Sequence, residues 1–233
     1  MNDILKLGYV PRISKAQFDD EATEFLQKYW PDALTTPSAV PIEHIAKKKM
    51  GLRIHEHRLT EDFSVLGMMC FTTGLAEIYN KENDEYREIK VRYGTMIIDP
   101  DTLAKRNVGC LHNTMAHEAL HWHKHRNYHI LNAVQPIEKF VCPADEPDES
   151  QQGRWSDEDW MEWQARGIAP RILMPIQTVK TVFDRLLDKS QENAFIKAGL
   201  MPPDKWLIEQ MAAFYSVSKQ AAEIRMSELG LIR

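Results

Sequence analysis

The chain has 233 residues, 43% of them hydrophobic and 27% charged, and its 29 Lys and Arg against 34 Asp and Glu give a formal net charge of −5. This composition predicts a globular protein of one domain, or one domain with an appendage, and its acidic balance argues against a general binder of nucleic-acid phosphates. No stretch approaches the ~18 apolar residues of a membrane span, and three cysteines without metal-binding spacing favour a reducing cytoplasm.

The first hundred residues predict two helices followed by strands. Apolar residues between Phe18 and Tyr29 recur on one helical face, so we expect a helix that Ser14 caps, and a shorter helix begins near Pro41. Runs rich in Val, Ile, Tyr and Met then predict a small, mostly antiparallel sheet, with strands at residues 52–58, 64–72, 75–79 and 87–99 and a hairpin turn at 80–85.

Helices predominate after residue 100, so the fold class is α+β. Residues 143–155 form an acidic loop, which is either simply solvated or a flap that guards a substrate site. We expect a tail at 1–13, a main domain at 14–200 and a C-terminal helical subdomain at 201–233 packed on it.

The C-terminal subdomain has the pattern of a helix, a turn and a second helix from Asp204 onward, as in DNA-binding proteins. Four acidic and four basic residues cancel in this segment, whereas contact with phosphates requires an excess of base. We therefore expect these helices to serve packing or substrate recognition, with no direct contact to nucleic acid.

Histidine is concentrated in one segment, since six of the nine histidines lie between His112 and His129. His117 and His121 are separated by one helical turn and face away from the apolar stripe of their helix, toward a cleft. Two imidazoles in this spacing can bind one metal ion, and Glu118 is placed to take a proton from the water that the metal activates. The alternative is a fortuitous or purely structural match to this His-Glu-x-x-His pattern.

A catalytic zinc ion needs a third protein ligand. His125 shares the face of His117 but lies ~12 Å from it along the helix axis, too far for the same ion. The best source is the helix that Ser156 caps, where Glu162 stands between two tryptophans and its carboxylate would be costly to bury without a cation. From these features Glu162 is preferred, and Glu158 remains the alternative.

Three separate motifs resemble the ImmA/IrrE family of metallopeptidases: His117–His121, Glu162–Pro175, and Phe214–Ser218 followed by Leu229–Leu231. The resemblance implies a compact zincin-like fold and a zinc endopeptidase in which His117, His121 and Glu162 bind Zn2+ and Glu118 is the catalytic base. Two features depart from the family: Arg166 replaces a usual Asn, and the linker between the second histidine and Glu162 is long.

The resemblance also implies a function. We expect a cytoplasmic endopeptidase that cleaves a specific protein, a helix-turn-helix transcriptional repressor, and so derepresses genes of a mobile element or stress response. The alternative is a non-proteolytic, metal-containing regulatory or partner-binding module.

Two further features of the sequence have a structural and a functional interpretation. The strand at 94–99 is either an edge that pairs with a peptide substrate or a central buried strand. Four residues after the metal motif are near enough to assist catalysis, but we expect surface positions at a helix end for His123, His125, Tyr128 and His129.

Overall fold

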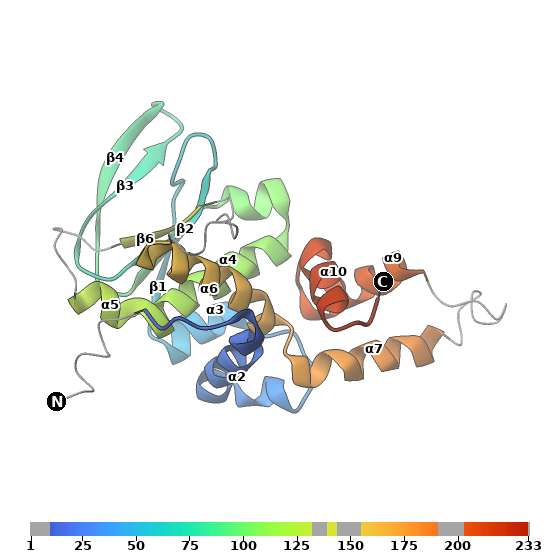
Figure 1. The fold of residues 1–233 in the computed structure, drawn as a ribbon. Coiled ribbons are helices and arrows are strands. Elements are labelled where there is room, and N and C mark those ends of the chain that lie inside the picture. The colour runs from blue at the N-terminus through green and yellow to red at the C-terminus, as the bar shows by residue number, and fades with distance from the viewer. Residues whose placement is uncertain (1–9, 132–138, 144–154, 191–202, 233) are drawn as a thin grey trace, which may run out of the picture.

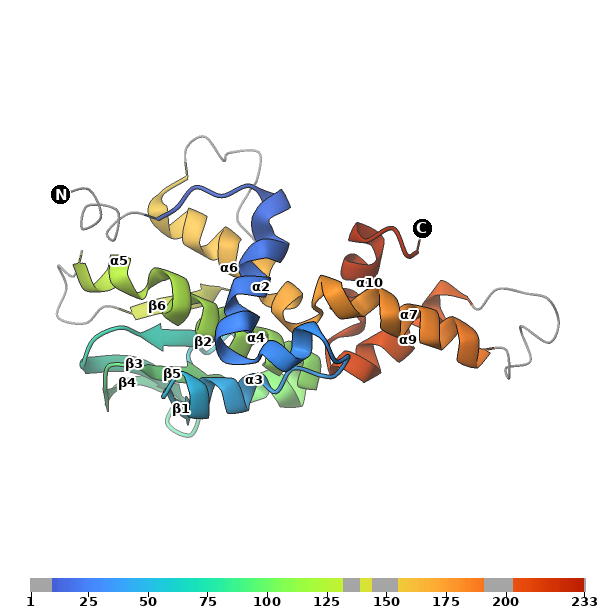
Figure 2. The same cartoon turned by 90° about the horizontal axis from the view of Figure 1, so that it is seen from below.

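The computed structural model describes residues 10–131, 139–143, 155–190 and 203–232, which form a mixed α+β fold as predicted. The strands lie at one end of the molecule, two long helices cross its middle, and the C-terminal helices occupy the other end (Figures 1 and 2). The middle helices are α4 (Val108–Leu120) and α6 (Asp157–Leu173), and the far end holds α7 (Ile176–Ser190), α9 (Asp204–Tyr215) and α10 (Lys219–Glu228). None of the described helices is both long and apolar enough to cross a membrane.

A four-stranded sheet has the order β1 (Arg53–Glu56), β5 (Thr95–Ile98), β2 (Val65–Cys70) and β6 (Lys139–Pro143). Strand β5 is parallel to β1, whereas the pairings of β2 with β5 and with β6 are antiparallel. The expected preference for antiparallel pairing is confirmed. Because β5 is flanked on both sides, the prediction that it offers an edge to a substrate is wrong, and its interpretation as a central buried strand is correct.

Strands β3 (Gly74–Asn80) and β4 (Glu85–Val91) form a separate two-stranded sheet around the predicted hairpin turn. The single strand predicted at 87–99 is wrong, because the chain leaves β4 after Val91 and turns at Gly94 before it enters β5. Gly94 has a φ of 76°, a conformation that glycine adopts without strain.

The first helix, α2 (Phe18–Tyr29), follows a short 3-10 turn at Lys15–Gln17. Ser14 precedes this turn as predicted, and its backbone N–H donates to the Gln17 side chain at 2.9 Å. Phe18 packs against Trp163 of α6 with 4.5 Å between ring centroids. A Cβ atom at Gly167 would lie 1.9 Å from the Phe18 ring, so this glycine lets α2 and α6 approach closely.

Helix α3 (Ile42–His44) is short and continues as a π-helical turn.

The two faces of the four-stranded sheet bury different sets of side chains. Met69 and Met96 belong to the main core with residues of α2, α4 and α6. The neighbouring residues Met68 and Ile97 point to the opposite face, as the pleat of a strand requires. There they form a second cluster, which the β3–β4 hairpin covers, with Leu59, Cys70, Ala76, Ile78 and Val91. The central strands β2 and β5 are therefore buried on both faces, whereas β1 is partly exposed.

The C-terminal helices contact α4 at its N-terminal end. A Cβ atom at Gly109 would lie 2.1 Å from the backbone nitrogen of Ser218, the residue that caps α10. One turn further along α4, His112 Nδ1 is 2.9 Å from the carbonyl oxygen of Ser216. This close backbone contact places the start of α10 beside the helix that carries both histidines of the metal motif.

A buried arginine joins α10 to two other helices. Arg225 is 2% exposed and its guanidinium forms an ion pair with Asp19 of α2. Its Nε donates to the carbonyl oxygen of Met174, directly after α6, at 3.2 Å. The predicted helix-turn-helix arrangement is thus attached to the rest of the molecule by charge as well as by apolar contact. The predicted boundary at residue 200 and the acidic loop, apart from its ends, lie outside the described residues.

Candidate metal centre

Three side chains from two helices meet inside the molecule. His117 lies in α4, His121 opens the π-helical turn that extends α4, and Glu162 lies in the second turn of α6. One ligand atom from each side chain can be chosen so that all three lie within 4.8 Å of one another. Glu162 Oε2 is 3.3 Å from His117 Nε2 and 3.6 Å from His121 Nε2. Glu158, the alternative third ligand, is exposed to solvent.

Local capping fixes where both helices begin. Asn107 caps α4, and its side-chain oxygen accepts a hydrogen bond from the backbone N–H of Cys110 at 2.9 Å. Ser156 caps α6 as predicted, because Asp159 N–H donates to its hydroxyl oxygen at 3.1 Å and the Asp159 carboxylate accepts from the Ser156 N–H. These caps set the register in which the histidines and Glu162 face one another.

The nitrogen and oxygen atoms that meet in this cluster are suited to bind a cation. His117 Nε2 and His121 Nε2 are 3.0 Å apart, so a hydrogen bond between them would use a proton on one ring only. Glu162 Oε2 is buried and accepts no hydrogen bond within the described chain. A buried carboxylate oxygen without a donor is costly, and a cation among these three atoms would remove that cost. The cluster can therefore hold a metal ion.

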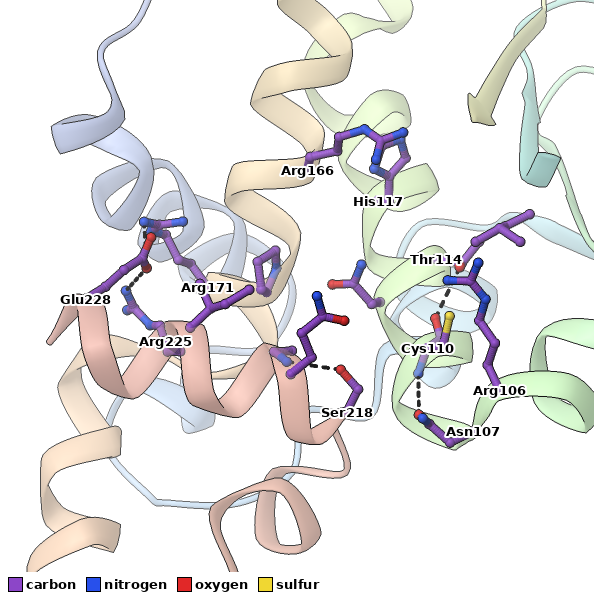
Figure 3. A pocket seen from close by; sticks show the side chains of 16 residues that line it. Arg106, Asn107, Cys110, Thr114, His117, Arg166, Arg171, Ser218, Arg225 and Glu228 are labelled. Carbon is purple, nitrogen blue, oxygen red and sulfur yellow. Dashed lines mark hydrogen bonds and ion pairs between the residues drawn. The ribbon is translucent and has the colours of Figure 1, made fainter. Parts of the chain in front are cut away.

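The second oxygen of Glu162 has a partner of its own. Arg166, one turn further along α6, donates from Nε to Glu162 Oε1 at 2.8 Å. Figure 3 shows Arg166 beside His117, between α4 and α6. Arg166 thus orients the carboxylate with Oε2 toward the two histidines, a role that sequence reasoning did not assign to it.

Glu118 is completely buried, and neither of its carboxylate oxygens has a hydrogen-bond partner within the described chain. It lies against β2, where a Cβ atom at Gly67 would be only 2.7 Å from Glu118 Oε1. Gly67 therefore provides the space that this carboxylate occupies. Sequence reasoning missed Gly67, although a glycine inside a strand can indicate a close approach of another group.

The environment sets the protonation of these groups. Burial lowers the pKa of His121 to about 4, although the nearby Glu162 carboxylate acts in the opposite direction. Burial alone would raise the pKa of Glu162, but the two nearby histidines, His117 above all, hold it below its ordinary value. Burial, and then the charge of Glu162, raise the pKa of Glu118 well above its ordinary value. A neutral imidazole and an ionised carboxylate are the forms that bind metals.

A cavity of ≈ 560 Å3 adjoins the cluster. His117 and Arg166 line one part of it, and further residues of α4, α6 and α10, together with Leu66 and the turn before α4, line the rest (Figure 3). In Figure 3, Arg106 and Asn107 lie near the start of α4 and Ser218 lies at the start of α10, and all three line the cavity. A cleft is therefore present beside His117, and α10 forms one of its walls, but His121 is fully buried and does not line it, contrary to the expectation that both histidines face the cleft.

The expectation of surface histidines after the motif is wrong for His125 and His129, which are 1% and 5% exposed. His129 stacks on Phe71 at 4.2 Å between ring centroids. His125 contacts Gln164 of α6. The sequence did not reveal these positions because the covering residues come from distant parts of the chain. As expected, His125 is not part of the cluster of possible metal ligands.

We compared the chain with known proteins. No protein-family model matches it, and neither a curated protein nor a solved structure gives a significant match.

Proposed function

We propose that this protein is a zinc-dependent endopeptidase of the ImmA/IrrE type, with a zincin-like fold. The observation that carries the proposal is the convergence of His117, His121 and Glu162 in the interior, with the unpartnered carboxylate of Glu118 in the adjacent position of the helix. Two histidines and one carboxylate are a ligand set of hydrolytic zinc enzymes, which leave a further coordination position for water or substrate.

Each residue has a separate task in this proposal. His117 Nε2, His121 Nε2 and Glu162 Oε2 would hold the metal, and Arg166 would hold the Glu162 carboxylate in place. Bound zinc supplies a Lewis acid that makes water a better nucleophile and polarises the substrate carbonyl.

Glu118 would move the proton. An oxygen of its carboxylate accepts a proton from the attacking water and delivers it to the nitrogen of the leaving amine. The buried site raises the pKa of Glu118 above its ordinary value, so that its carboxylate takes up a proton more readily than an exposed glutamate does. The complete burial of Glu118 also keeps bulk water away from this exchange.

The substrate proposal rests on the cavity and on the resemblance. A cavity of ≈ 560 Å3 can receive a few residues of a peptide beside His117. We propose a helix-turn-helix repressor as the substrate and the cytoplasm as the place of cleavage. Direct DNA binding is disfavoured, because the segment from Asp204 to Arg233 carries balanced charge.

The decisive experiment compares the wild type with Glu118→Gln. The repressor encoded beside the gene is incubated with each zinc-loaded protein, and the wild type should give a discrete product that a chelator abolishes and added zinc restores. Glu118→Gln should retain zinc and lose cleavage by at least about 100-fold, because a positioned general base contributes that much. Glu158→Gln, at an exposed position of α6, is the matched control and should cleave normally.

One observation favours the second candidate, a non-proteolytic module in which the metal is structural. His117, His121 and Glu118 are each at most 1% exposed, and closed sites are typical of structural metals. If the zinc-loaded wild type cleaves neither the repressor nor unfolded casein, while Glu118→Gln leaves regulation unchanged in cells, this candidate replaces the endopeptidase.

A further inference from the structure

A line of hydrogen-bonding groups runs from the backbone before α2 to the metal cluster. Gln164 Nε2 is 2.6 Å from the carbonyl oxygen of Pro11, and Gln164 Oε1 is 3.2 Å from His125 Nε2. The other nitrogen of that ring, His125 Nδ1, is 3.0 Å from His121 Nδ1. His121 then presents its remaining nitrogen, Nε2, to His117 and Glu162.

The first link fixes the orientation of an amide. A backbone carbonyl oxygen only accepts hydrogen bonds, so the atom of Gln164 that faces Pro11 must be the NH2 group. The reverse orientation would place two oxygens 2.6 Å apart. The amide oxygen of Gln164 therefore faces His125, and this assignment follows from the bonding partners alone.

The next links fix the position of each ring proton. Because Gln164 Oε1 is an acceptor, His125 Nε2 must carry a proton. A neutral imidazole with its proton on Nε2 accepts at Nδ1, and burial of His125 favours the neutral ring. His121 Nδ1 must then donate to His125, which leaves an unprotonated lone pair on His121 Nε2.

We propose that Pro11, Gln164 and His125 act as positioning residues that hold His121 in the tautomer able to bind metal through Nε2. The inference rests on the metal-binding part of the proposed function and not on peptide hydrolysis. Metal-binding histidines are commonly oriented by an acceptor at their second nitrogen, and here that acceptor is itself oriented by an amide and a backbone carbonyl.

The direct test is an NMR experiment on the histidine rings of the 15N-labelled wild-type protein, with and without zinc. The 15N shifts distinguish a ring nitrogen that carries a proton from one that does not. We expect a proton on Nδ1 of His121 and on Nε2 of His125 in both states, and a shift of His121 Nε2 when zinc binds. A proton on Nδ1 of His125 in either state, or no binding of zinc, would overturn the inference.

A pair of variants tests the same series of hydrogen bonds by its effect on metal affinity. His125→Phe keeps a planar ring but removes the acceptor, and should weaken zinc binding ten- to a hundredfold, as is typical when a metal-binding histidine loses the partner of its second nitrogen. His123→Phe is the matched control, because His123 lies in the same turn but contacts the Tyr29 hydroxyl instead of the cluster. It should bind zinc as the wild type does.

Gln164→Met provides an independent variant that preserves side-chain length. It should leave the fold intact and weaken zinc binding less than His125→Phe does. Because the acceptor at His125 Nε2 is gone, the NMR spectrum should show a mixture of the two neutral tautomers of His125. Equal zinc affinities for the wild type and His125→Phe would contradict the proposal. If the tautomers are as expected but Glu118→Gln still cleaves, only the peptidase mechanism fails.

Discussion

Two residues near the metal cluster act by positioning a neighbouring carboxylate. Gly67 leaves space for the Glu118 carboxylate, and Arg166 occupies one oxygen of Glu162 so that the other faces the histidines. His117 and His121 were predictable, because their i, i+4 spacing is a local property of a helix, whereas the residues left Glu158 as an alternative to Glu162 and the choice of Glu162 followed from the resemblance. Gly67 and Arg166 were not, since their roles depend on which elements pack together.

Gly67→Ala should impair cleavage without removing the metal. The new Cβ atom would lie 2.7 Å from Glu118 Oε1 and 2.8 Å from Thr114 Cγ2, so the Glu118 carboxylate must move. Misplacement of a catalytic group by ~1 Å can lower the rate about 100-fold. We expect zinc affinity within about twofold of wild type, measured by competition with a chromophoric chelator. An unchanged rate of cleavage would show that Glu118 does not act from this position.

At the scale of the element, the helices followed the sequence more closely than the strands did. Ser14 at the start of the 3-10 turn before α2, the cap of α6 and the separation of α9 from α10 agree with local signals. The order of the strands could not be predicted from local sequence. Strand β5 pairs with β1 and β2, which come much earlier in the chain, and β6 follows the helix that carries His117. The π-helical turn His121–His125 also lacks a local signal, and it brings His125 against His121.

Ser156→Ala should loosen the start of α6. The substitution removes the acceptor of the Asp159 N–H and should lower the free energy of unfolding by ~1 kcal/mol. Because Glu162 lies in the second turn of this helix, zinc affinity should fall slightly as well. Urea unfolding measures the first effect. Ser227→Ala, at an exposed helical position in α10, is the control and should change stability by less than about 0.5 kcal/mol.

At the scale of the molecule, the segment that resembles a DNA-binding unit is a wall of the cavity beside the metal cluster. Two contacts of Arg225 in α10 join parts of the chain that are far apart in sequence. One is its ion pair with Asp19 of α2, and the other is its hydrogen bond to the end of α6. The balanced charges of the segment predicted a packing role, but not its partners.

Arg225→Met should strongly destabilise the folded protein. Removal of one member of a buried ion pair typically costs about 3–5 kcal/mol, and we expect the lower end of this range because Asp19 is 27% exposed and keeps Arg171 Nε at 3.7 Å. Lys219→Met is the matched control, since its pair with Glu209 is exposed and should contribute at most ~1 kcal/mol. Similar urea midpoints for the two variants would show that Arg225 does not hold the helices together.

The contact at Gly109 determines how wide the cavity can be. The backbone of α4 at Gly109 packs directly against the backbone of Val217 and Ser218, with no side chain between them. This contact lies at the N-terminal end of α4 and at the beginning of α10. Even one methyl group at this position would force the walls apart and change which peptides fit between them. In the proposed endopeptidase, substrate selection and the placement of the proposed catalytic groups would thus be linked through a residue that has no side chain.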